Sequence, residues 1–126
     1  MASVEQIQNV VAQYVELLAA HQPETIVDLF ADNATIEDPV GTEPKTGRQT
    51  LVDFYTVLAS MEDISAELLW CKVAADTAVF SFKLRTGTGS YRFELSPVDI
   101  MVFDDDAKIV SLRAVFDPAT DITPIS

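Results

Sequence analysis

Apolar residues in the first part of the chain recur at the spacing of an α-helix. They follow Ser3 at intervals of three and four positions and continue to about Ala20, which predicts an amphipathic helix. Ser3 and Gln6 have the spacing of a capping box, in which each side chain satisfies a backbone donor at the start of the helix. The apolar positions of this helix are Val4, Ile7, Val10, Val11, Tyr14, Val15 and Leu18.

Two further helices are predicted before residue 60. Pro23 suits the first turn of a short helix, because its missing N–H would have no partner there in any case. Thr46 and Gln49 form a second potential capping box, so we expect a third helix to start beside them. An extended segment, 34–38, lies between these helices and ends at Pro39. The apolar residues assigned to the two helices are Ile26, Val27, Leu29 and Phe30, then Leu51, Phe54, Tyr55 and Leu58.

From about residue 65 the pattern changes to that of β-strands. Apolar and polar residues alternate between Ala78 and Arg85, which marks a strand with one buried face. Pro97 cannot donate to a ladder of backbone hydrogen bonds, so we expect a bend or bulge where it interrupts a longer strand. The predicted strands are 65–73, 78–85, 91–103 and 108–116, with turns at 86–90 and 104–107.

Helices that precede strands along the chain are typical of an α+β fold with an antiparallel sheet. We predict a curved antiparallel β-sheet wrapped by the three N-terminal helices, with a cone-shaped pocket between them. Such a pocket is a natural ligand site. The length of 126 residues suits a single domain, 1–126, that buries about two-thirds of its unfolded surface.

The chain is strongly acidic. It has 20 Asp and Glu against 8 Lys and Arg, which gives a net charge of −12. Phosphate backbones and anionic lipids repel such a surface, so we expect neither nucleic acid nor a membrane as partner. A neutral, apolar or cationic ligand is favoured instead. The hydrophobic fraction of 48% excludes an intrinsically disordered protein.

Cysteine usage and the N-terminus indicate the compartment. The single cysteine, Cys71, cannot form an internal disulfide, so nothing indicates an oxidising environment. No signal peptide is evident at the N-terminus, and no apolar run approaches the roughly 20 residues of a membrane span. We therefore expect a cytoplasmic protein.

Two polar residues stand where the pattern predicts apolar surroundings. Tyr14 lies on the apolar face of the first helix, and Asp99 shares a strand face with Met101 and Phe103. Desolvation would raise the pKa of a buried Asp99, and the neutral acid could donate a hydrogen bond. Two alternatives stay open: Tyr14 as an ordinary core tyrosine, and a solvated face around Asp99.

A third polar residue, Asp38, ends the extended segment. Its neighbour Glu37 points to the opposite side of the chain, so at most one of the two faces the pocket. Asp before Pro also opens turns, which is an alternative role for Asp38. A carboxylate base combined with a tyrosine and a carboxylic acid as donors would suit proton abstraction next to a carbonyl, with the enolate stabilised at its oxygen.

These residues stand in a sequence that resembles the Δ5-3-ketosteroid isomerases of the nuclear transport factor 2-like, or SnoaL-like, superfamily. The similarity covers nearly the whole chain and implies the cystatin-like cone of that superfamily. The run 31–39 is shared in part with polyketide cyclases and dehydratases, whereas the combination of Tyr14, Asp38 and Asp99 is more specific to the isomerases. The stretches that carry the similarity are 14–18, 26–41, 54–55, 97–99 and 110–116.

The resemblance implies a role for each candidate residue. Asp38 would be the general base that moves a proton from C4 to C6 of a steroid. Tyr14 and a protonated Asp99 would form the oxyanion hole for the dienolate, in a family that is itself a standard example of pKa tuning. Tyr55 corresponds to the tyrosine that orients Tyr14.

The resemblance also implies an apolar slot for the steroid and a homodimer formed through the outer face of the sheet. Some relatives carry a further tyrosine at the position of Phe30, so the hydrogen-bond network is expected to be shorter here. Phe116 stands where some relatives have Trp. The residues expected to line the slot, each of which could equally be plain core, are Leu18, Phe54, Phe82, Leu84, Leu112, Ala114 and Phe116.

Little in the sequence supports other chemistry. The chain has one histidine, His21, and one cysteine, and Asp104–Asp106 lacks the glycine and the distal glutamate of a calcium loop. We therefore expect no metal and no cofactor. Two alternatives to an isomerase stay open: a related cyclase or dehydratase on the same scaffold, and a non-catalytic module that binds small hydrophobic molecules.

Overall fold

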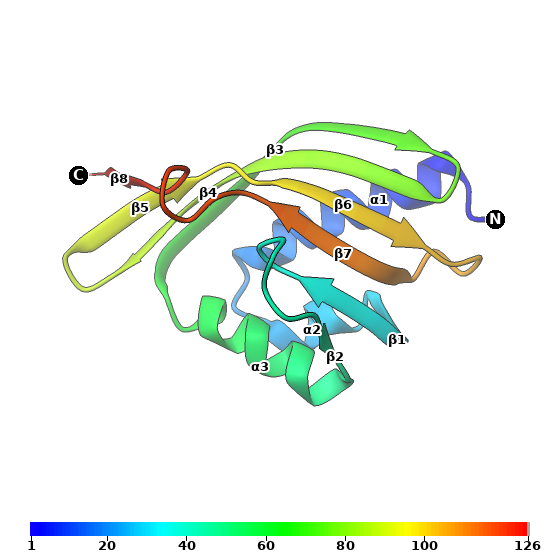
Figure 1. The fold of residues 1–126 in the computed structure, drawn as a ribbon, viewed down its shortest axis with the longest axis horizontal. Coiled ribbons are helices and arrows are strands. Elements are labelled where there is room, and N and C mark those ends of the chain that lie inside the picture. The colour runs from blue at the N-terminus through cyan, green and yellow to red at the C-terminus, as the bar shows by residue number, and fades with distance from the viewer. Residues whose placement is uncertain (126) are drawn as a thin grey trace.

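A single β-sheet organises the molecule. The computed structural model describes residues 1–125 and contains, within them, three helices and eight strands (Figure 1). The helices are α1 (Val4–Leu18), α2 (Pro23–Val27) and α3 (Arg48–Ala59). The strands are β1 (Phe30–Glu37), β2 (Lys45–Thr46), β3 (Glu62–Ala74), β4 (Thr77–Thr88), β5 (Tyr91–Leu95), β6 (Val98–Phe103), β7 (Ile109–Val115) and β8 (Thr123–Ile125).

The sheet is mixed, with one parallel pairing. Its order is β2-β1-β7-β6-β4-β5-β8, and β3 pairs with β4. Strand β1 runs parallel to β7, while the other pairs are antiparallel, so the expectation of a wholly antiparallel sheet needs this amendment. The predicted α+β fold, a curved sheet wrapped by three helices, is confirmed.

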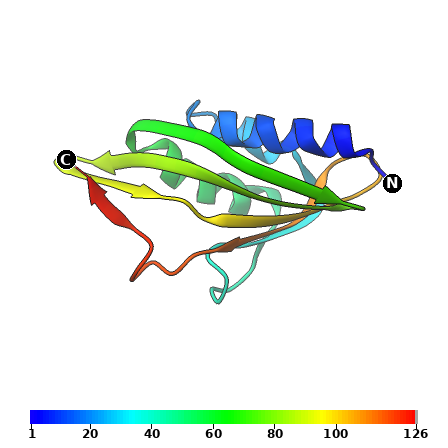
Figure 2. The ribbon, with the colours of Figure 1, turned by 90° about the horizontal axis from the view of Figure 1, so that it is seen from above.

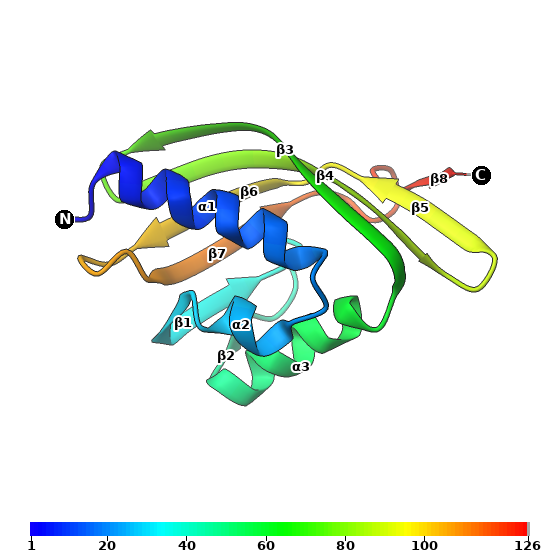
Figure 3. The same ribbon diagram turned by 180° about the vertical axis from the view of Figure 1, so that it is seen from behind.

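The helices all cover the same face of the sheet. Helix α1 lies lengthwise across that face, and α2 and α3 follow beside it (Figures 2 and 3). The side of α1 that faces the sheet is buried, as the helical spacing of its apolar residues predicts. Its buried residues are Ile7, Val11, Tyr14, Val15 and Leu18. None of the helices in residues 1–125 is long and apolar enough to cross a membrane.

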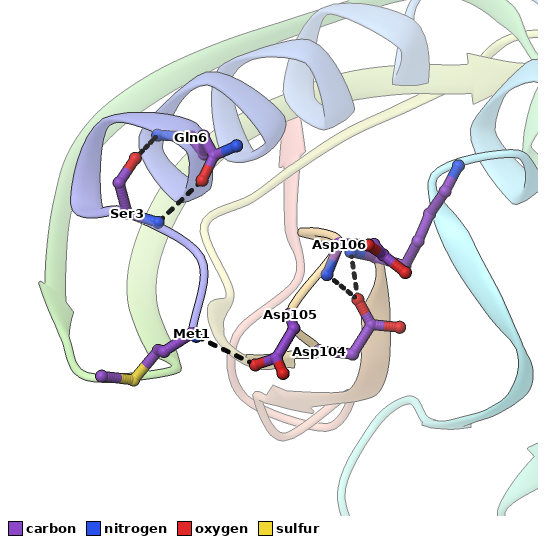
Figure 4. A network of polar contacts seen from close by, with 7 residues as sticks. Met1, Ser3, Gln6, Asp104, Asp105 and Asp106 are labelled. Atoms are coloured by element: carbon purple, nitrogen blue, oxygen red, sulfur yellow. Dashed lines mark hydrogen bonds and ion pairs between the residues drawn. The ribbon is translucent and has the colours of Figure 1, made fainter.

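The predicted capping box at the start of α1 is confirmed. The Ser3 amide donates to Gln6 Oε1 at 2.8 Å, and the Gln6 amide donates to Ser3 Oγ at 3.1 Å (Figure 4). Nearby, the N-terminal amino group lies 3.1 Å from Asp105 Oδ1 in the turn between β6 and β7. These contacts fix the beginning of the helix that carries Tyr14.

The second predicted capping box is wrong. The N-cap of α3 is Gly47, at φ 92°, and it has no side-chain hydrogen bond. Thr46 belongs to β2, where its hydroxyl donates to the carbonyl of Ala34 in β1 at 3.0 Å. Strand pairing therefore uses the hydroxyl that the sequence pattern assigned to the helix, and glycine supplies the left-handed backbone instead.

The long strand predicted over 91–103 is two strands. Strand β4 pairs with β6 over Thr77–Ser81 and with β5 over Leu84–Thr88, and the chain crosses between these partners around Pro97. The Ser81 hydroxyl donates to the carbonyl of Pro97 at 2.9 Å. The bend expected at this proline is thus a complete interruption, and it lets the sheet curve around the space beneath α1 and α3.

Three other boundaries differ from the sequence pattern. Strand β4 continues to Thr88, so the predicted turn at 86–90 is shorter. Phe30 begins β1 rather than ending α2. Strand β8 was not predicted, because Pro124 makes its segment look unlike a strand; as an edge strand paired only with β5, it tolerates the missing donor.

Candidate active site

An apolar cavity lies between the helices and the inner face of the sheet. Its volume is about 310 Å³, at the lower end of the range typical of small-molecule sites. Four polar residues reach this cavity: Tyr14 from α1, Asp38 after β1, Tyr55 from α3 and Asp99 from β6. The other lining residues are Leu18, Phe54, Val57, Leu58, Met61, Phe82, Leu84, Phe93, Leu95, Pro97 and Phe116.

The two tyrosines form a buried pair. Their hydroxyl oxygens are 2.8 Å apart, and burial raises the pKa of each phenol well above its ordinary value. Each hydroxyl has one proton, so only one of them can donate within the pair. If Tyr55 donates, the proton of Tyr14 is available to a ligand in the cavity. The hydroxyl of Tyr14 is thus satisfied, as in a core tyrosine, and also lies at the cavity wall.

Phe30 supports this pair without adding to it. Its ring lies 6.4 Å from that of Tyr14 and 6.1 Å from that of Tyr55, measured between centroids. Phe80 packs edge-on against Tyr14 from the sheet, at 6.2 Å. A tyrosine at position 30 could extend the hydrogen-bond chain, whereas phenylalanine limits it to two hydroxyls. The rings instead hold Tyr14 in place by aromatic packing.

Asp99 is buried among apolar neighbours. Only 2% of its surface is exposed, so the alternative of a solvated strand face is wrong. On β6 it stands directly between Phe80 of β4 and Ala114 of β7, which are 0% and 1% exposed. Burial, with a smaller contribution from the charge of Asp38, raises the pKa of Asp99 well above its ordinary value. Burial thus favours the neutral form of Asp99, which can donate a hydrogen bond.

One carboxyl oxygen of Asp99 has an unmet hydrogen-bonding requirement. Among residues 1–125, its Oδ1 is a buried side-chain atom without a hydrogen-bond partner. A buried polar atom of this kind carries a desolvation cost unless something else satisfies it. Because Asp99 lines the cavity, a ligand with a polar oxygen at this end could do so.

Asp38 combines partial burial with a cavity position. It follows the last residue of β1, and the next peptide bond, to Pro39, is cis. Asp38 lies directly before the turn that the Thr42 amide closes on the carbonyl of Pro39, and it also lines the cavity. Burial raises its pKa to about 6, against the opposing effect of Lys45. It is therefore ionised at pH 7 and a stronger base than a solvated aspartate.

Glu37 points away from Asp38. Its Oε1 accepts from Arg113 Nε at 2.8 Å and its Oε2 from the Gly41 amide at 3.2 Å. These bonds lower the pKa of Glu37 and tie the turn after Asp38 to strand β7. The sequence argument that only one of the two carboxylates faces the pocket agrees with this placement.

The structure divides the residues expected to line the slot into two groups. Leu18, Phe54, Phe82, Leu84 and Phe116 line the cavity. Leu112 and Ala114 lie instead in the core, at 0% and 1% exposure, and Leu112 packs beside Ile36 and Met101. Ala114 is paired with Asp99 of β6, which lines the cavity, but neither Leu112 nor Ala114 is among the lining residues.

Several lining residues are not predicted by the sequence pattern. Val57, Leu58 and Met61 come from the end of α3 and the turn after it, while Phe93, Leu95 and Pro97 come from β5 and the break that follows. The apolar period of α3 could have suggested Leu58, which was assigned to its buried face. The residues of β5 became wall residues only because the strand breaks at Pro97.

The set of groups favours proton transfer over other chemistry. A carboxyl group with a pKa of about 6, a second carboxyl group whose pKa burial raises well above its ordinary value, and a pair of tyrosine hydroxyls line one apolar space. Within residues 1–125, no group of three or more His, Cys, Asp or Glu side chains is arranged to hold a metal ion. His21 lies outside the cavity lining, with Nδ1 2.7 Å from the carbonyl of Ala59.

Comparison with known proteins places the chain in a family. The sequence model of the SnoaL-like domain matches residues 11–112. The chain belongs to the SnoaL-like family. This SnoaL-like protein is also 38% identical over 113 residues to the "Steroid Delta-isomerase" of Nocardioides simplex, covering 90% of this chain and 91% of that protein.

The fold recurs in a more distant solved structure. That protein is SalBIII, described as an epoxide hydrolase/cyclase-like enzyme with a role in pyran ring formation in polyether salinomycin. The two structures superpose with a TM-score of 0.90 over 99% of this chain and 100% of the other, at 24% sequence identity. At this identity the likeness shows a shared fold, on which the site residues decide the chemistry.

Proposed function

We propose that this protein is a steroid Δ-isomerase, which converts Δ5-3-ketosteroids into Δ4-3-ketosteroids without a cofactor. The observation that carries the proposal is the convergence of an ionised Asp38, a neutral Asp99 and the paired Tyr14 on one apolar cavity. The 38% identity to a steroid Delta-isomerase supports the same activity.

Asp38 is the general base of the proposed reaction. Its carboxylate takes a proton from C4 of the steroid, and the electron pair of the C–H bond moves through the carbonyl group to the oxygen at C3. The dienolate then takes the same proton back at C6, which moves the double bond into conjugation. Because burial raises the pKa of Asp38 to about 6, the group can both accept and release this proton near pH 7.

Tyr14 and Asp99 are the proposed oxyanion hole. Negative charge develops on the steroid oxygen in the dienolate, so fixed donors stabilise that state more than the starting ketone. In the proposed reaction Tyr55 is the donor in its hydrogen bond with Tyr14, which leaves the Tyr14 proton free for the ligand; the distance of 2.8 Å allows this direction. A neutral Asp99 donates a second hydrogen bond to the same steroid oxygen. The unpartnered Oδ1 belongs to this carboxyl group.

An absorbance assay tests the proposal. The protein is mixed with a β,γ-unsaturated 3-ketosteroid, and formation of the conjugated enone is followed in the ultraviolet. We expect a protein-dependent rise in absorbance. Asp38→Asn should lower kcat by about 10²- to 10⁴-fold, the usual contribution of a general base, while a phenolic steroid still binds.

The outcomes separate the three candidate functions. If the folded protein binds the phenolic steroid but gives no enone, a non-catalytic binding module is indicated. If it neither binds nor converts steroids, the proposal is wrong and a cyclase or dehydratase of another substrate becomes the better hypothesis.

A further inference from the structure

Lys45 places a cation against Phe54, a wall residue of a cavity whose titratable lining residues are all acids. It pairs with Ile36 across strands β2 and β1, so the two side chains share one face of the sheet. Ile36 is fully buried, which identifies this face as the inner one. Asp38 lies two residues beyond Ile36 and reaches the cavity from the same side.

The contact of the Lys45 ammonium group fixes where its charge lies. Its Nζ is 4.9 Å from the centroid of the Phe54 ring, a cation–π distance, and Phe54 lines the cavity beside Asp38. Lys45 is itself partly buried. Solvent screens the charge of a partly buried ammonium group less than that of a fully exposed one.

The other titratable groups around Asp38 cannot supply a positive charge. Tyr14 of α1, Tyr55 of α3 and Asp99 of β6 are acids, and the charge of Asp38 raises the pKa of each. Glu37 faces the other side of the sheet, where it is paired with Arg113. Lys45 opposes the effect of burial and lowers the pKa of Asp38.

We propose that Lys45 is a positioning residue that keeps the Asp38 carboxylate ionised between turnovers. This inference rests on the proposed role of Asp38 as base. Lys45 touches Phe54 rather than the reacting atoms, so it acts through Asp38 and through the ring that forms the wall beside it. Its charge favours the ionised base of the resting protein and leaves Tyr14 and Asp99 as the groups that meet the substrate oxygen.

The direct test titrates Asp38 without substrate. The ¹³C resonance of its side-chain carboxyl is followed against pH in the parent, in Lys45→Met and in Lys45→Arg, with Asp38→Asn to assign the signal. We expect a higher titration midpoint in Lys45→Met and an almost unchanged one in Lys45→Arg. Lys72→Met removes the same charge from an exposed position on β3 and should leave the midpoint unchanged.

Kinetics supply the second readout. In Lys45→Met, kcat/KM at pH 5 should fall about three- to ten-fold, while the plateau at high pH stays within about twofold. Raising the ionic strength should reduce this difference, because screening weakens the charge of Lys45 in the parent. A uniform loss at every pH would indicate a packing role at Phe54 and would overturn the proposal.

The two proposals can fail separately. If the protein shows no isomerase activity, the titration still decides whether Lys45 controls Asp38. If the midpoint of Asp38 is the same in the parent and in folded Lys45→Met, the inference is wrong, whatever the activity. Lys45→Gln repeats both measurements should Lys45→Met fail to fold.

Discussion

Asp38 and Asp99 line the same cavity but lie in different surroundings. Asp99 stands between Phe80 and Ala114 within the sheet, and burial raises its pKa well above the ordinary value. Asp38 lies at the end of a strand, is less enclosed, and has Lys45 nearby, so its pKa is raised only to about 6. Burial therefore favours the neutral form more strongly for Asp99 than for Asp38, as the proposed roles of acid and base require.

The pKa of Asp38 predicts the pH dependence of the reaction. Only the ionised carboxylate can accept a proton, so kcat/KM should be level above about pH 7 and fall about tenfold per pH unit well below pH 6. Initial rates of enone formation between pH 4 and 9 check this. A profile that is flat from pH 4 to 8 would show that a group other than Asp38 is the base.

The protonation of Asp99 predicts a stability that depends on pH. The folded protein holds the Asp99 proton more tightly than the unfolded chain, because burial raises this pKa above the ordinary value of 3.8. The stabilisation is therefore complete below about pH 4 and is lost as the pH rises towards the folded pKa.

Asp99→Asn, which cannot ionise, should accordingly be more stable than the parent near pH 7. The difference in unfolding free energy should grow by up to about 1.4 kcal/mol per pH unit above pH 4. Urea unfolding of both proteins at several pH values measures it. An equal difference at every pH would mean that Asp99 is not protonated in the folded protein. The amide keeps a donor in the site, so activity should fall less than in Asp99→Leu, which has none.

At the scale of elements, α1 and the break between β5 and β6 position the site. Tyr14 and Leu18 project from the buried side of α1, so the angle of this helix sets where the Tyr14 hydroxyl lies. Pro97 lies between β5 and β6, which pair with different parts of β4. Phe93 and Leu95 of β5 form part of the cavity wall beside this break. The polar groups that line the cavity thus come from separate elements held by one curved sheet.

The N-terminal capping box of α1 contributes to the unfolding free energy of the protein. Ser3→Ala removes the hydroxyl that accepts from the Gln6 amide and should lower the unfolding free energy by about 1 kcal/mol. The catalytic residues are distant, so kcat should be unchanged. Gln49→Ala is the matched control, because α3 has no side-chain cap and Gln49 bonds only to the exposed Asp53. Thermal unfolding of both variants decides whether the capping box alone carries the effect.

At the scale of the molecule, the outer face of the sheet has no helix upon it (Figure 2). Trp70, Ser81, Val98 and Val115 are paired in a row across strands β3, β4, β6 and β7, and so share that face. Trp70 and Val115 are 45% and 47% exposed, which leaves apolar surface in contact with water.

This outer face is where the homodimer predicted from the family resemblance would form. We expect a dimer by sedimentation equilibrium, and Val115→Glu should shift it towards monomer by placing two charges in the contact. Val4→Glu adds the same charge to an exposed position on α1, on the other side of the sheet, and should leave the mass unchanged. A parent that sediments as a monomer at micromolar concentration would refute the expectation.

Features that depend on near neighbours along the chain are predictable from its residues. Helical spacing placed Tyr14 on the buried side of α1, and the two-residue period of β6 placed Asp99 on the same face as Met101 and Phe103. These periods follow from the geometry of each element, so a short window of sequence contains them. The expectation of helices packed on one curved sheet follows from their order along the chain.

Features that depend on pairing between distant segments became known from the folded structure. Thr46 bonds to Ala34 rather than capping α3, and Leu112 lies in the core although its face is the one that elsewhere forms the cavity. Lys45 is near Asp38 because β2 pairs with β1, a contact that no local pattern encodes. A residue's face is set by its own strand, but its depth, its neighbours and therefore its pKa are set by how the sheet curves and what packs against it.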